Sequence, residues 1–410
     1  MTTTDNNPTS VINAHKPPHL PDEAPLKLDY LDTYPVNPSA VSRVLPLDNM
    51  DQELVRSLKS ANAPVVTLDG DWDTPLEVAF EELDVYRALH DRVRNGTPWQ
   101  STPFFARVMR EINGGTVKWG CTSEEQLLER LEKRVVGLYK DIKKNGYKTQ
   151  AQLNSKKPAD EIRLAIDRYG HFLFIDGRHR LTCAKLLKLN HVPCKIVLRH
   201  TQWVDFQNEI LEYARASGSN KIYQRIAHPD LANIPAHHVD PRAEWMVASL
   251  GDYNPAGKRL VDIGAHWGLM CHTLEDAGFS CTAIEKIPAA HSFMDRIRIA
   301  SEKKFTTWCG DVFDYPDFDG VSVVVALNIL HHFLKKESLY GRLVKLLQRL
   351  DPEIMFFQPH TADPPGQMKN AFRNLGEQEF VEFVGKHTGL QHSRHLGTAS
   401  DGRPVCKLWR

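Results

Sequence analysis

The sequence is poor in the features that mark secreted, zinc-binding and membrane-spanning proteins. Its 410 residues include only seven cysteines, an odd number, and none of them form a C-x-x-C pair. This pattern gives neither a disulfide framework nor a zinc ligand set. The apolar runs have the length of strands, well short of the roughly 18 residues that a membrane-spanning helix needs, and Met1-Thr-Thr-Thr-Asp5 lacks the shape of a signal peptide. We therefore expect no membrane insertion and a reducing, cytoplasmic setting.

A net charge is also absent. Lys and Arg together number 51, and so do Asp and Glu, so no chain-wide positive field draws the protein to nucleic acid or to an anionic membrane. The chain is longer than the roughly 250–300 residues at which a single hydrophobic core stops growing. We expect two globular domains and a tail, and nothing in the sequence indicates an oligomeric state.

The tail is expected at the N-terminus. Seven prolines lie among polar residues in residues 1–45, which offer little to bury. This composition predicts a flexible, disordered arm over residues 1–45. Further on, Asp69-Gly-Asp-Trp-Asp73 has three aspartates but lacks the remaining ligands of a calcium loop. We interpret it as a turn anchored by Trp72.

A β-loop-α-β pattern begins at Leu260-Val-Asp-Ile-Gly264 and runs to Glu285. An apolar run leads into a loop with Gly264 and Gly268, an amphipathic stretch ends at Gly278, and a second apolar run comes after it. Glycines let the backbone pass close under a ligand, and Glu285 ends the second strand where a carboxylate can hold both ribose hydroxyls. The loop lacks the G-x-G-x-x-G turn that a pyrophosphate needs. A ligand with a ribose and no phosphate therefore fits better.

Two further motifs come next along the chain. Gly310-Asp-Val312 comes after a third expected strand, and Val321–Asn328 is expected to form a fourth. With these motifs, residues 241–410 resemble the class I S-adenosylmethionine-dependent methyltransferases. The resemblance implies an α/β fold with a Rossmann-like seven-stranded sheet and S-adenosyl-L-methionine as cofactor. An α/β sheet whose glycines serve only as turns is the alternative.

The same resemblance implies a set of cofactor-binding residues. They are Asp262, Gly264 and Gly268 against the methionine part, with Ala265 in the same loop, Glu285 on the ribose, Asp311 and Val312 at the adenine, and Asn328 under the sulfonium.

Histidines come after the fourth and fifth expected strands, at the edge where doubly wound sheets bind ligands. His331 and His332 come shortly after Asn328, and His360 comes after a strand that ends at Gln358. Methylation of a hydroxyl or an amine requires removal of a proton, for which an imidazole is the usual acceptor. His332 is the first candidate base, with His331 and His360 next. Purely structural histidines, or a metal site made from them, are the alternatives.

The segment at the end of the fourth strand narrows the substrate classes. Asn328-Ile-Leu-His331 is not the Pro-Pro-aromatic sequence expected where an exocyclic amine of a base is methylated, and residues 241–410 contain no Pro-Cys nucleophile of a cytosine C5 enzyme. Together with the balanced charge, this favours a small molecule or a glycan end over nucleic acid as the acceptor.

A second motif lies in the N-terminal half. A strand over Glu161–Ile166, a turn and a strand over His171–Ile175 lead into Asp176-Gly-Arg-His-Arg180 and an apolar helix. Two arginines, a histidine and free backbone N–H groups at a helix start suit an anion such as phosphate. The candidate phosphate-binding or nucleotide-binding residues are Asp176, Gly177, Arg178, His179 and Arg180.

This region resembles the ParB/sulfiredoxin superfamily, whose members carry a Gly-x-x-Arg-type motif at such a strand-to-helix junction and bind nucleotide phosphates there. The resemblance implies a small α+β domain over residues 46–205 that binds ATP or another nucleotide with Mg. Cys183 lies inside the expected helix and not in the loop, which argues against the reductase chemistry of some members. Residues 206–240 are expected to be a linker or lid and show no helix-turn-helix pattern.

Three functions are consistent with these motifs. The first is a methyltransferase that acts on a hydroxyl or an amine of a small molecule or glycan and carries an N-terminal nucleotide-binding domain. The second is a kinase for a small molecule or sugar with an accessory methyltransferase domain. The third is a non-catalytic, nucleotide-gated scaffold.

Overall fold

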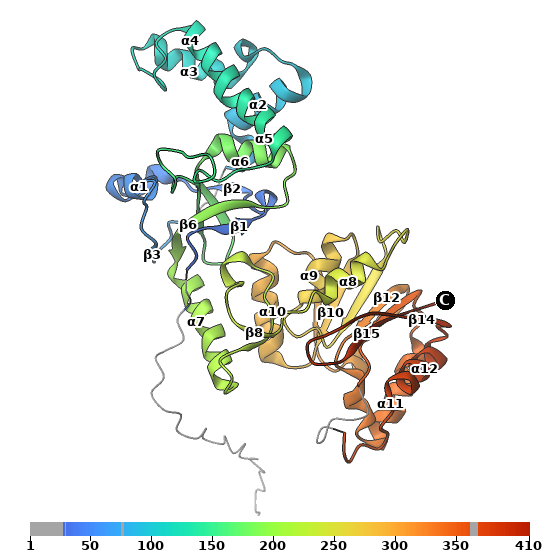
Figure 1. Ribbon diagram of the computed structural model, residues 1–410. Helices are drawn as coiled ribbons and strands as arrows, with labels where there is room; N and C mark the ends of the chain where they lie inside the picture. The colour runs from blue at the N-terminus through green and yellow to red at the C-terminus, as the bar shows by residue number, and fades with distance from the viewer. Residues whose placement is uncertain (1–27, 29, 75–77, 361–367) are drawn as a thin grey trace, which may run out of the picture.

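The computed structural model describes residues 28, 30–74, 78–360 and 368–410. Within these ranges the chain is α/β, with one large sheet in each half (Figure 1). The first part of the expected disordered arm, residues 1–27 and 29, lies outside the described residues. No described helix is both long enough and apolar enough to cross a membrane.

The N-terminal half is built on a mixed sheet of six strands. They are β1 (Tyr34–Val36), β2 (Arg43–Val44), β3 (Val66–Leu68), β4 (Ile162–Ile166), β5 (Phe172–Asp176) and β6 (Val192–His200). The order is β1-β6-β4-β5-β2, and β3 also pairs with β6. Because β6 is long, β1 pairs with its first residues and β3 with its last on the same side. The α6 helix (Arg178–Leu186) comes directly after β5, as the sequence predicts.

The prediction of a disordered arm over residues 1–45 is wrong for residues 34–45. Tyr34, Val36, Val41 and Leu45 are each at most 1% exposed, and β1 and β2 both pair within the sheet. The prolines that suggested disorder fit this structure, since an edge strand tolerates proline. The alternation of buried and exposed residues over Tyr34–Val36 is too short to show in the average composition of residues 1–45.

Helices inserted between β3 and β4 project from the top of Figure 1, away from the second sheet. They are α2 (Asp84–Asn95), α3 (Pro103–Asn113), α4 (Glu124–Arg130) and α5 (Gly137–Asn145). The α1 helix (Gln52–Leu58) comes before β3 and does not belong to this group. A π-helical segment, Leu131–Val136, joins α4 to α5. These helices share a hydrophobic core with α6. The loop that begins α6 is therefore covered by this helical group.

The C-terminal half contains the seven-stranded sheet that the sequence predicts. Its strands are β9 (Arg259–Ile263), β10 (Ser280–Glu285), β11 (Thr306–Cys309), β12 (Val321–Ala326), β13 (Ile354–Phe357), β14 (His392–Thr398) and β15 (Pro404–Trp409). The order is β11-β10-β9-β12-β13-β15-β14. The first five strands run parallel, and β15 is antiparallel to both of its neighbours. The strand order reverses between β9 and β12, which is where sheets of this kind bind ligands.

Two layers of helices cover this sheet. They are α8 (Arg242–Ala248), α9 (Leu269–Asp276) and α10 (Pro288–Ala300) on one side, and α11 (Glu337–Arg349) and α12 (Glu377–Thr388) on the other. Successive residues of a strand pack against opposite layers. For example, Leu260 packs with Met246 and Leu274, whereas Val261 packs with Leu343. Burial on both faces explains why the central strands β12 and β13 are almost wholly apolar.

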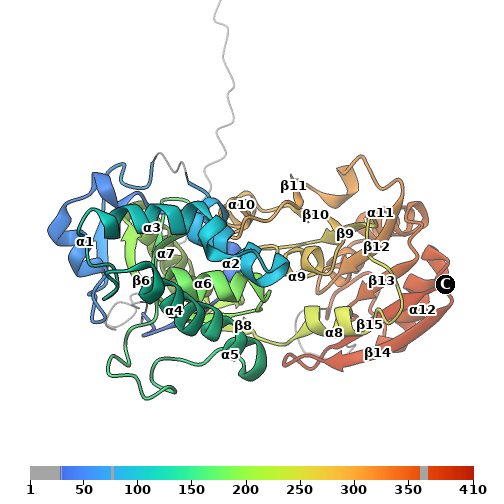
Figure 2. The same cartoon turned by 90° about the horizontal axis from the view of Figure 1, so that it is seen from above.

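The two halves share one hydrophobic core. The boundary expected at residues 205/206 falls inside α7 (Thr201–Ala216), which buries Trp203 and Phe206. These side chains join the first sheet to Trp267 and Ile297 of the second half. The bridge after α7 forms a short ladder, β7 (Ile222–Gln224) with β8 (Ala236–His238), and Figure 2 shows the halves beside each other. Residues 206–240 are thus a packed part of the interface and not a free linker.

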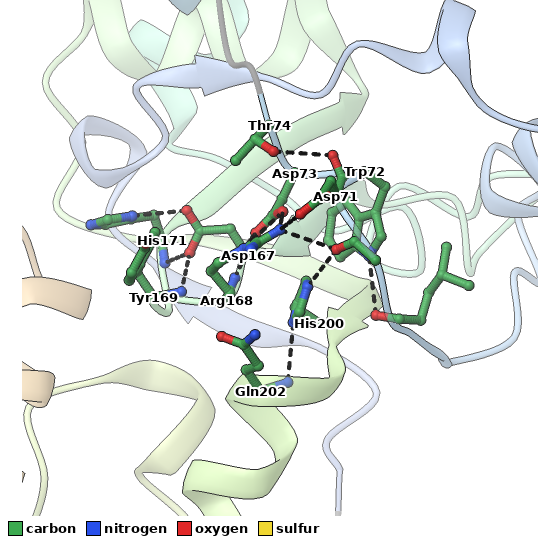
Figure 3. Close-up of polar contacts among 12 residues, drawn as sticks. Asp71, Trp72, Asp73, Thr74, Asp167, Arg168, Tyr169, His171, His200 and Gln202 are labelled. Carbon is green, nitrogen blue, oxygen red and sulfur yellow. Dashed lines mark hydrogen bonds and ion pairs between the residues drawn. The ribbon is translucent and has the colours of Figure 1, made fainter.

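A polar network supports this interface (Figure 3). The Arg168 guanidinium donates to Asp73 and Asp71, which fixes the turn after β3 to the turn between β4 and β5. In that second turn, Nδ1 of His171 lies 2.9 Å from Asp167, and Nε2 lies 3.0 Å from the Ile299 carbonyl at the end of α10. Trp72 packs against His200 as the expected anchor of its turn.

Gly170 lies where the halves are closest, and we predict that Gly170→Ala destabilises the protein strongly. A Cβ at this position would overlap the Trp203 ring and lie 2.5 Å from Cβ of Ala300, in a backbone with φ +96°. Overpacking costs about 1–3 kcal/mol, and the left-handed backbone adds about 1–2 kcal/mol. Gly218→Ala is the control, because Gly218 has φ +73° and open space around it. Urea unfolding should show a loss at Gly170 at least about 1 kcal/mol larger than at Gly218. Equal losses would contradict close packing at Gly170.

A second prediction concerns pH. Burial acts to lower the pKa of His171, but its bond to Asp167 outweighs burial and the pKa is raised. Only the imidazolium can donate to both Asp167 and the Ile299 carbonyl. A raised pKa in the folded protein means that this stabilisation is complete at low pH and is lost as pH rises through that pKa. The stability advantage of the wild type over His171→Gln should fall by about 1 kcal/mol between about pH 6 and about pH 8.5. His191→Gln, at an exposed histidine, should show no such trend.

Candidate active site

A cavity of about 430 Å³ opens at the carboxyl ends of β9, β10, β11 and β12. This is the edge of the sheet where the strand order reverses. Seven of the eight residues expected to bind a cofactor line it, namely Asp262, Gly264, Ala265, Glu285, Asp311, Val312 and Asn328. Because adjacent strands end side by side, the acids Asp311, Glu285 and Asp262 lie in sequence along the rim.

The Glu285 carboxylate is held in place by the backbone. One oxygen accepts the N–H of His266 at 2.8 Å, and the other accepts the N–H of Ile287 at 2.8 Å. Glu285 is 7% exposed at the end of β10. A carboxylate fixed in this way keeps lone pairs that face the cavity, since each oxygen can accept more than one hydrogen bond. It can therefore accept hydrogen bonds from a diol without moving.

The buried carboxyl group of Asp262 and the buried guanidinium of Arg242 line the same cavity, and each has an unused hydrogen-bonding atom. Burial, and then the charge of Glu285, raise the pKa of Asp262 to about 7, although Arg242 acts to lower it. Oδ2 of Asp262 and Nε of Arg242 have no hydrogen-bond partner, and Nη1 of Arg242 donates to Gln358 at 3.2 Å. Buried polar atoms without partners are costly. Together they suit a ligand group that carries both an ammonium and a carboxylate.

The end of the cavity near β11 combines one acid with apolar side chains. Although burial acts to raise it, the bond to Lys286 at 3.0 Å holds the pKa of Asp311 below its ordinary value. Val312 and Phe333 line this part together with Ile287, whose side chain is unusually exposed for isoleucine. Apolar surfaces beside a hydrogen-bond acceptor suit a flat heterocycle with an exocyclic amine.

The two glycines of the first loop have different roles. Gly264 has φ +74° and lines the cavity, where an added Cβ would lie 3.1 Å from Ile329. Gly268 is not among the lining residues, and its φ of +78° starts α9. A Cβ on Gly268 would lie 3.1 Å from Met294 and 3.2 Å from Phe305. Close helix packing accounts for this glycine without a cofactor contact.

Asn328 is held by two segments that are distant in sequence, at residue 223 and at residues 401–403. Its backbone has φ 55°, a strained value for a residue other than glycine. Oδ1 accepts from Arg403 at 2.8 Å, and Nδ2 lies 3.3 Å from the Tyr223 hydroxyl and 3.4 Å from Asp401. Because both ends of the amide are used, Asn328 shapes the cavity wall and leaves little hydrogen-bonding capacity for a ligand.

The three histidines form a stacked group, but only His332 lines the cavity. The His331 ring centroid lies 4.1 Å from that of His332 and 4.9 Å from that of His360. His331 and His360 are at most 2% exposed, and none of their ring nitrogens has a hydrogen-bond partner among the residues that the structure describes. No group of metal-ligating side chains occurs within the described ranges. His331 and His360 are thus placed behind the wall and cannot reach a substrate as bases.

His332 is a weak base in this setting. Burial, and then Lys335, lower the pKa of His332 to about 4. Burial lowers the pKa of His331 further, to about 2. Nζ of Lys335 lies 3.2 Å from Nδ1 of His332. An ammonium group can only donate, so this nitrogen accepts and Nε2 carries the hydrogen. In this arrangement His332 presents a donor, and not a proton acceptor, to a ligand.

The loop before α6 lines a separate cavity of about 590 Å³. Lining residues are Arg107, Lys118, Trp119, Arg134, Leu138, Asp160, Asp176, Gly177, Arg178, His179 and Arg180. Arg107 and Lys118 pair with Glu111, whereas Arg134 and Arg178 have no acidic partner within the described ranges. These last two cations are the ones available to an anion.

The five residues expected to bind phosphate are close in space but differ in availability. Arg180 pairs with Glu161 at 3.7 Å and with the Asp160 carbonyl, and Asp176 pairs with Arg163 at 2.6 Å. Gly177 caps α6 with φ 97°. Burial, and then Arg178, lower the pKa of His179 to about 4. Arg180 and Asp176 therefore have structural partners, and Arg178 is the exposed cation of the loop.

Several residues of the candidate site were missed by sequence reasoning. Tyr223 and Gln224 come from β7, and Arg242 begins α8, yet all three line the cavity. The His266 ring lies 4.9 Å from that of Tyr223. Tyr223, Gln224 and Arg242 belong to no local motif, whereas His266 lies in the loop between Gly264 and Gly268. Only the unusual placement of Arg242 in a short apolar helix was a usable signal.

No family model matches the sequence, and no curated protein is similar to it. Solved structures with a similar fold include magnesium protoporphyrin IX methyltransferase (ChlM) from Synechocystis PCC 6803 with bound SAM. It is 17% identical in sequence, and the match covers 41% of this chain and 77% of that chain with a TM-score of 0.33. The methyltransferase domain of a bacterial Hen1 has 16% identity, 41% and 97% coverage and a TM-score of 0.33. The bifunctional kinase-methyltransferase WbdD has 15% identity, 48% and 45% coverage and a TM-score of 0.35. Similarity this low does not establish a function.

Proposed function

We propose that this chain is an S-adenosylmethionine-dependent methyltransferase whose acceptor is a small molecule or a glycan end. One observation carries the proposal. The cavity at the switch point of the second sheet contains a buried Asp262 and Arg242 with unused hydrogen-bonding atoms, together with the Glu285 carboxylate fixed by two backbone N–H groups. An amino-acid group, a ribose and an adenine are the three parts that this lining would complement.

The residues present fit such a cofactor. Arg242 would hold its carboxylate and Asp262 its ammonium, which would keep Asp262 ionised despite burial. Glu285 would accept hydrogen bonds from the ribose hydroxyls, and Asp311 would accept one from the adenine amine. When bound, S-adenosyl-L-methionine supplies an electrophilic methyl group. The protein's part is to orient the two reactants and to exclude water.

A hydroxyl or amine acceptor would require His332 to take up a proton. The lowered pKa of His332, and the Lys335 ammonium against its Nδ1, favour this role less than the sequence suggested. A general base works best with a pKa near the operating pH. The surroundings of His332 therefore do not favour an acceptor atom that must lose a proton.

We predict that Glu285→Gln weakens binding of S-adenosyl-L-methionine by about tenfold or more, because hydrogen bonds to a charged group contribute about 1.5–3 kcal/mol. Isothermal titration calorimetry on the full chain measures this directly. Arg242→Gln should weaken cofactor binding by a similar factor, because it removes the cation that would hold the carboxylate of the cofactor.

Glu353→Gln is the matched control for this experiment. Glu353 lies at the start of β13, at the opposite edge of the same sheet, where it pairs with Lys258. Its substitution should leave the dissociation constant unchanged. Wild-type affinity in both Glu285→Gln and Arg242→Gln, with intact folding by circular dichroism, would remove the proposal.

A second candidate function is nucleotide binding by the N-terminal half, as the ParB/sulfiredoxin resemblance implies. The observation that favours it is the cavity beside α6, where Arg134 and Arg178 lack acidic partners among the described residues and Trp119 offers an aromatic face. ATP or another nucleotide with Mg is the proposed ligand. A kinase activity and a nucleotide-gated scaffold are both compatible with such binding, and ATP consumption would separate them.

Arg178→Gln should weaken binding of MgATP by about tenfold or more. The full chain must be used, because a fragment of residues 46–205 would lack β1 and β2 and would cut α7. Arg178 is a better target than Arg180, whose ion pairs make its loss destabilising. Lys140→Gln, at an exposed position on α5, is the control. No measurable ATP binding by the wild type would exclude this function.

A further inference from the structure

A group of five side chains lies at and directly behind the wall of the cavity beyond Asn328. We call it the histidine wall, and it consists of His332, which lines the cavity, with His331, His360, Lys335 and Arg403 behind it. The His331 ring stacks on that of His360 and is tilted against that of His332. Lys335 contacts His332 at 3.2 Å, and Arg403 contacts Asn328 at 2.8 Å. Because His332 and Asn328 line the cavity, this wall borders the space where a methyl acceptor would lie.

The wall is electropositive and rich in unused hydrogen-bonding groups. Burial lowers the pKa of all three histidines, and the cations Lys335 and Arg403 lower it further. Asp401 pairs with Arg403. The four ring nitrogens of His331 and His360 are buried and have no hydrogen-bond partner among the described residues, but they do not line the cavity. His332 does line it and presents its Nε2–H as a donor, so the wall matches an acceptor group that carries negative charge.

From this geometry we propose that the methyl acceptor is an oxyanion, either a carboxylate or a phosphate monoester, and not a hydroxyl or an amine. The proposal rests on the methyltransferase function proposed above and names its substrate class. An oxyanion is already deprotonated at neutral pH, so no general base is needed. This agrees with the weak basicity of His332 and with the inaccessibility of His331 and His360.

The chemical step balances without a proton acceptor. A lone pair of the oxyanion oxygen attacks the methyl carbon and forms the new carbon–oxygen bond. The carbon–sulfur bond breaks, and its electron pair stays on sulfur, which becomes a neutral thioether. In this step the Nε2–H of His332 would donate to the anion, Lys335 and Arg403 would attract it by their charge from behind His332 and Asn328, and the product is a methyl ester or a methyl phosphodiester.

The first test is anion binding to the full chain, saturated with S-adenosyl-L-homocysteine so that no reaction occurs. Acetate and inorganic phosphate are the probes, and calorimetry measures their dissociation constants. Lys335→Gln should weaken binding of the preferred probe by about tenfold, because the positive charge directly behind His332 is lost. Lys336→Gln removes the same charge from the adjacent, exposed residue and should leave binding unchanged.

The second test identifies the product formed from methyl-labelled cofactor and fractionated cell extract. Label released as methanol by mild alkali indicates a carboxylate acceptor, and label released only by a phosphodiesterase indicates a phosphate acceptor. Either result supports the proposal. Label in an ether or a methylamine would overturn it.

The two proposals fail in different ways. If the cofactor binds but neither anion does, or if Lys335→Gln binds anions as the wild type does, the oxyanion proposal is wrong and the methyltransferase function stands. If Glu285 and Arg242 prove irrelevant to cofactor binding, the methyltransferase function fails, and the oxyanion proposal fails with it.

Discussion

The packing of Trp267 into the core shared by both halves is the contact on which the rest of the structure depends. Its ring lies 5.3 Å from that of Tyr213 on α7 and 5.1 Å from that of Phe293 on α10. The preceding residue, His266, has a positive φ and donates its N–H to Glu285. The position of the Glu285 carboxylate thus depends on how α7 packs on α10. A change at the domain interface would therefore be felt at the cavity even where the changed residue does not line it.

The sequence predicted those parts of the fold and site that depend on neighbours along the chain. The strands β9 and β10, the loop between them and Glu285 form one continuous segment, so apolar periodicity and glycine positions suffice to place the carboxylate. Asp311 could be placed for the same reason, since it lies just after a strand. Gly268 was assigned to the cofactor because a glycine needed for a turn and for close packing looks the same in sequence as one that lies under a ligand.

The remaining residues could not be predicted because they reach the site through contacts between distant segments. Asn328 is held by Tyr223 and Arg403, which lie 105 and 75 residues away. Likewise Arg180 looked like a phosphate ligand, but its partners Asp160 and Glu161 come from the residues that lead into β4. Charge in a short motif shows that a cation is present and does not show which acid will neutralise it. Pairing of this kind is fixed only when the sheet assembles.

The histidine wall shows why such distant contacts matter for the chemistry. Each buried polar atom without a partner costs about 1–3 kcal/mol, and His331 and His360 together present four of them. A purely structural core would be more stable with apolar residues at both positions, so their burial beside Lys335 and Arg403 is a cost that stability alone does not explain. Burial, and then the charges of Lys335 and Arg403, lower the pKa of His331 and His332. The positive charge that would attract an anionic acceptor therefore also disfavours protonation of these rings, and the free site offers a poor general base.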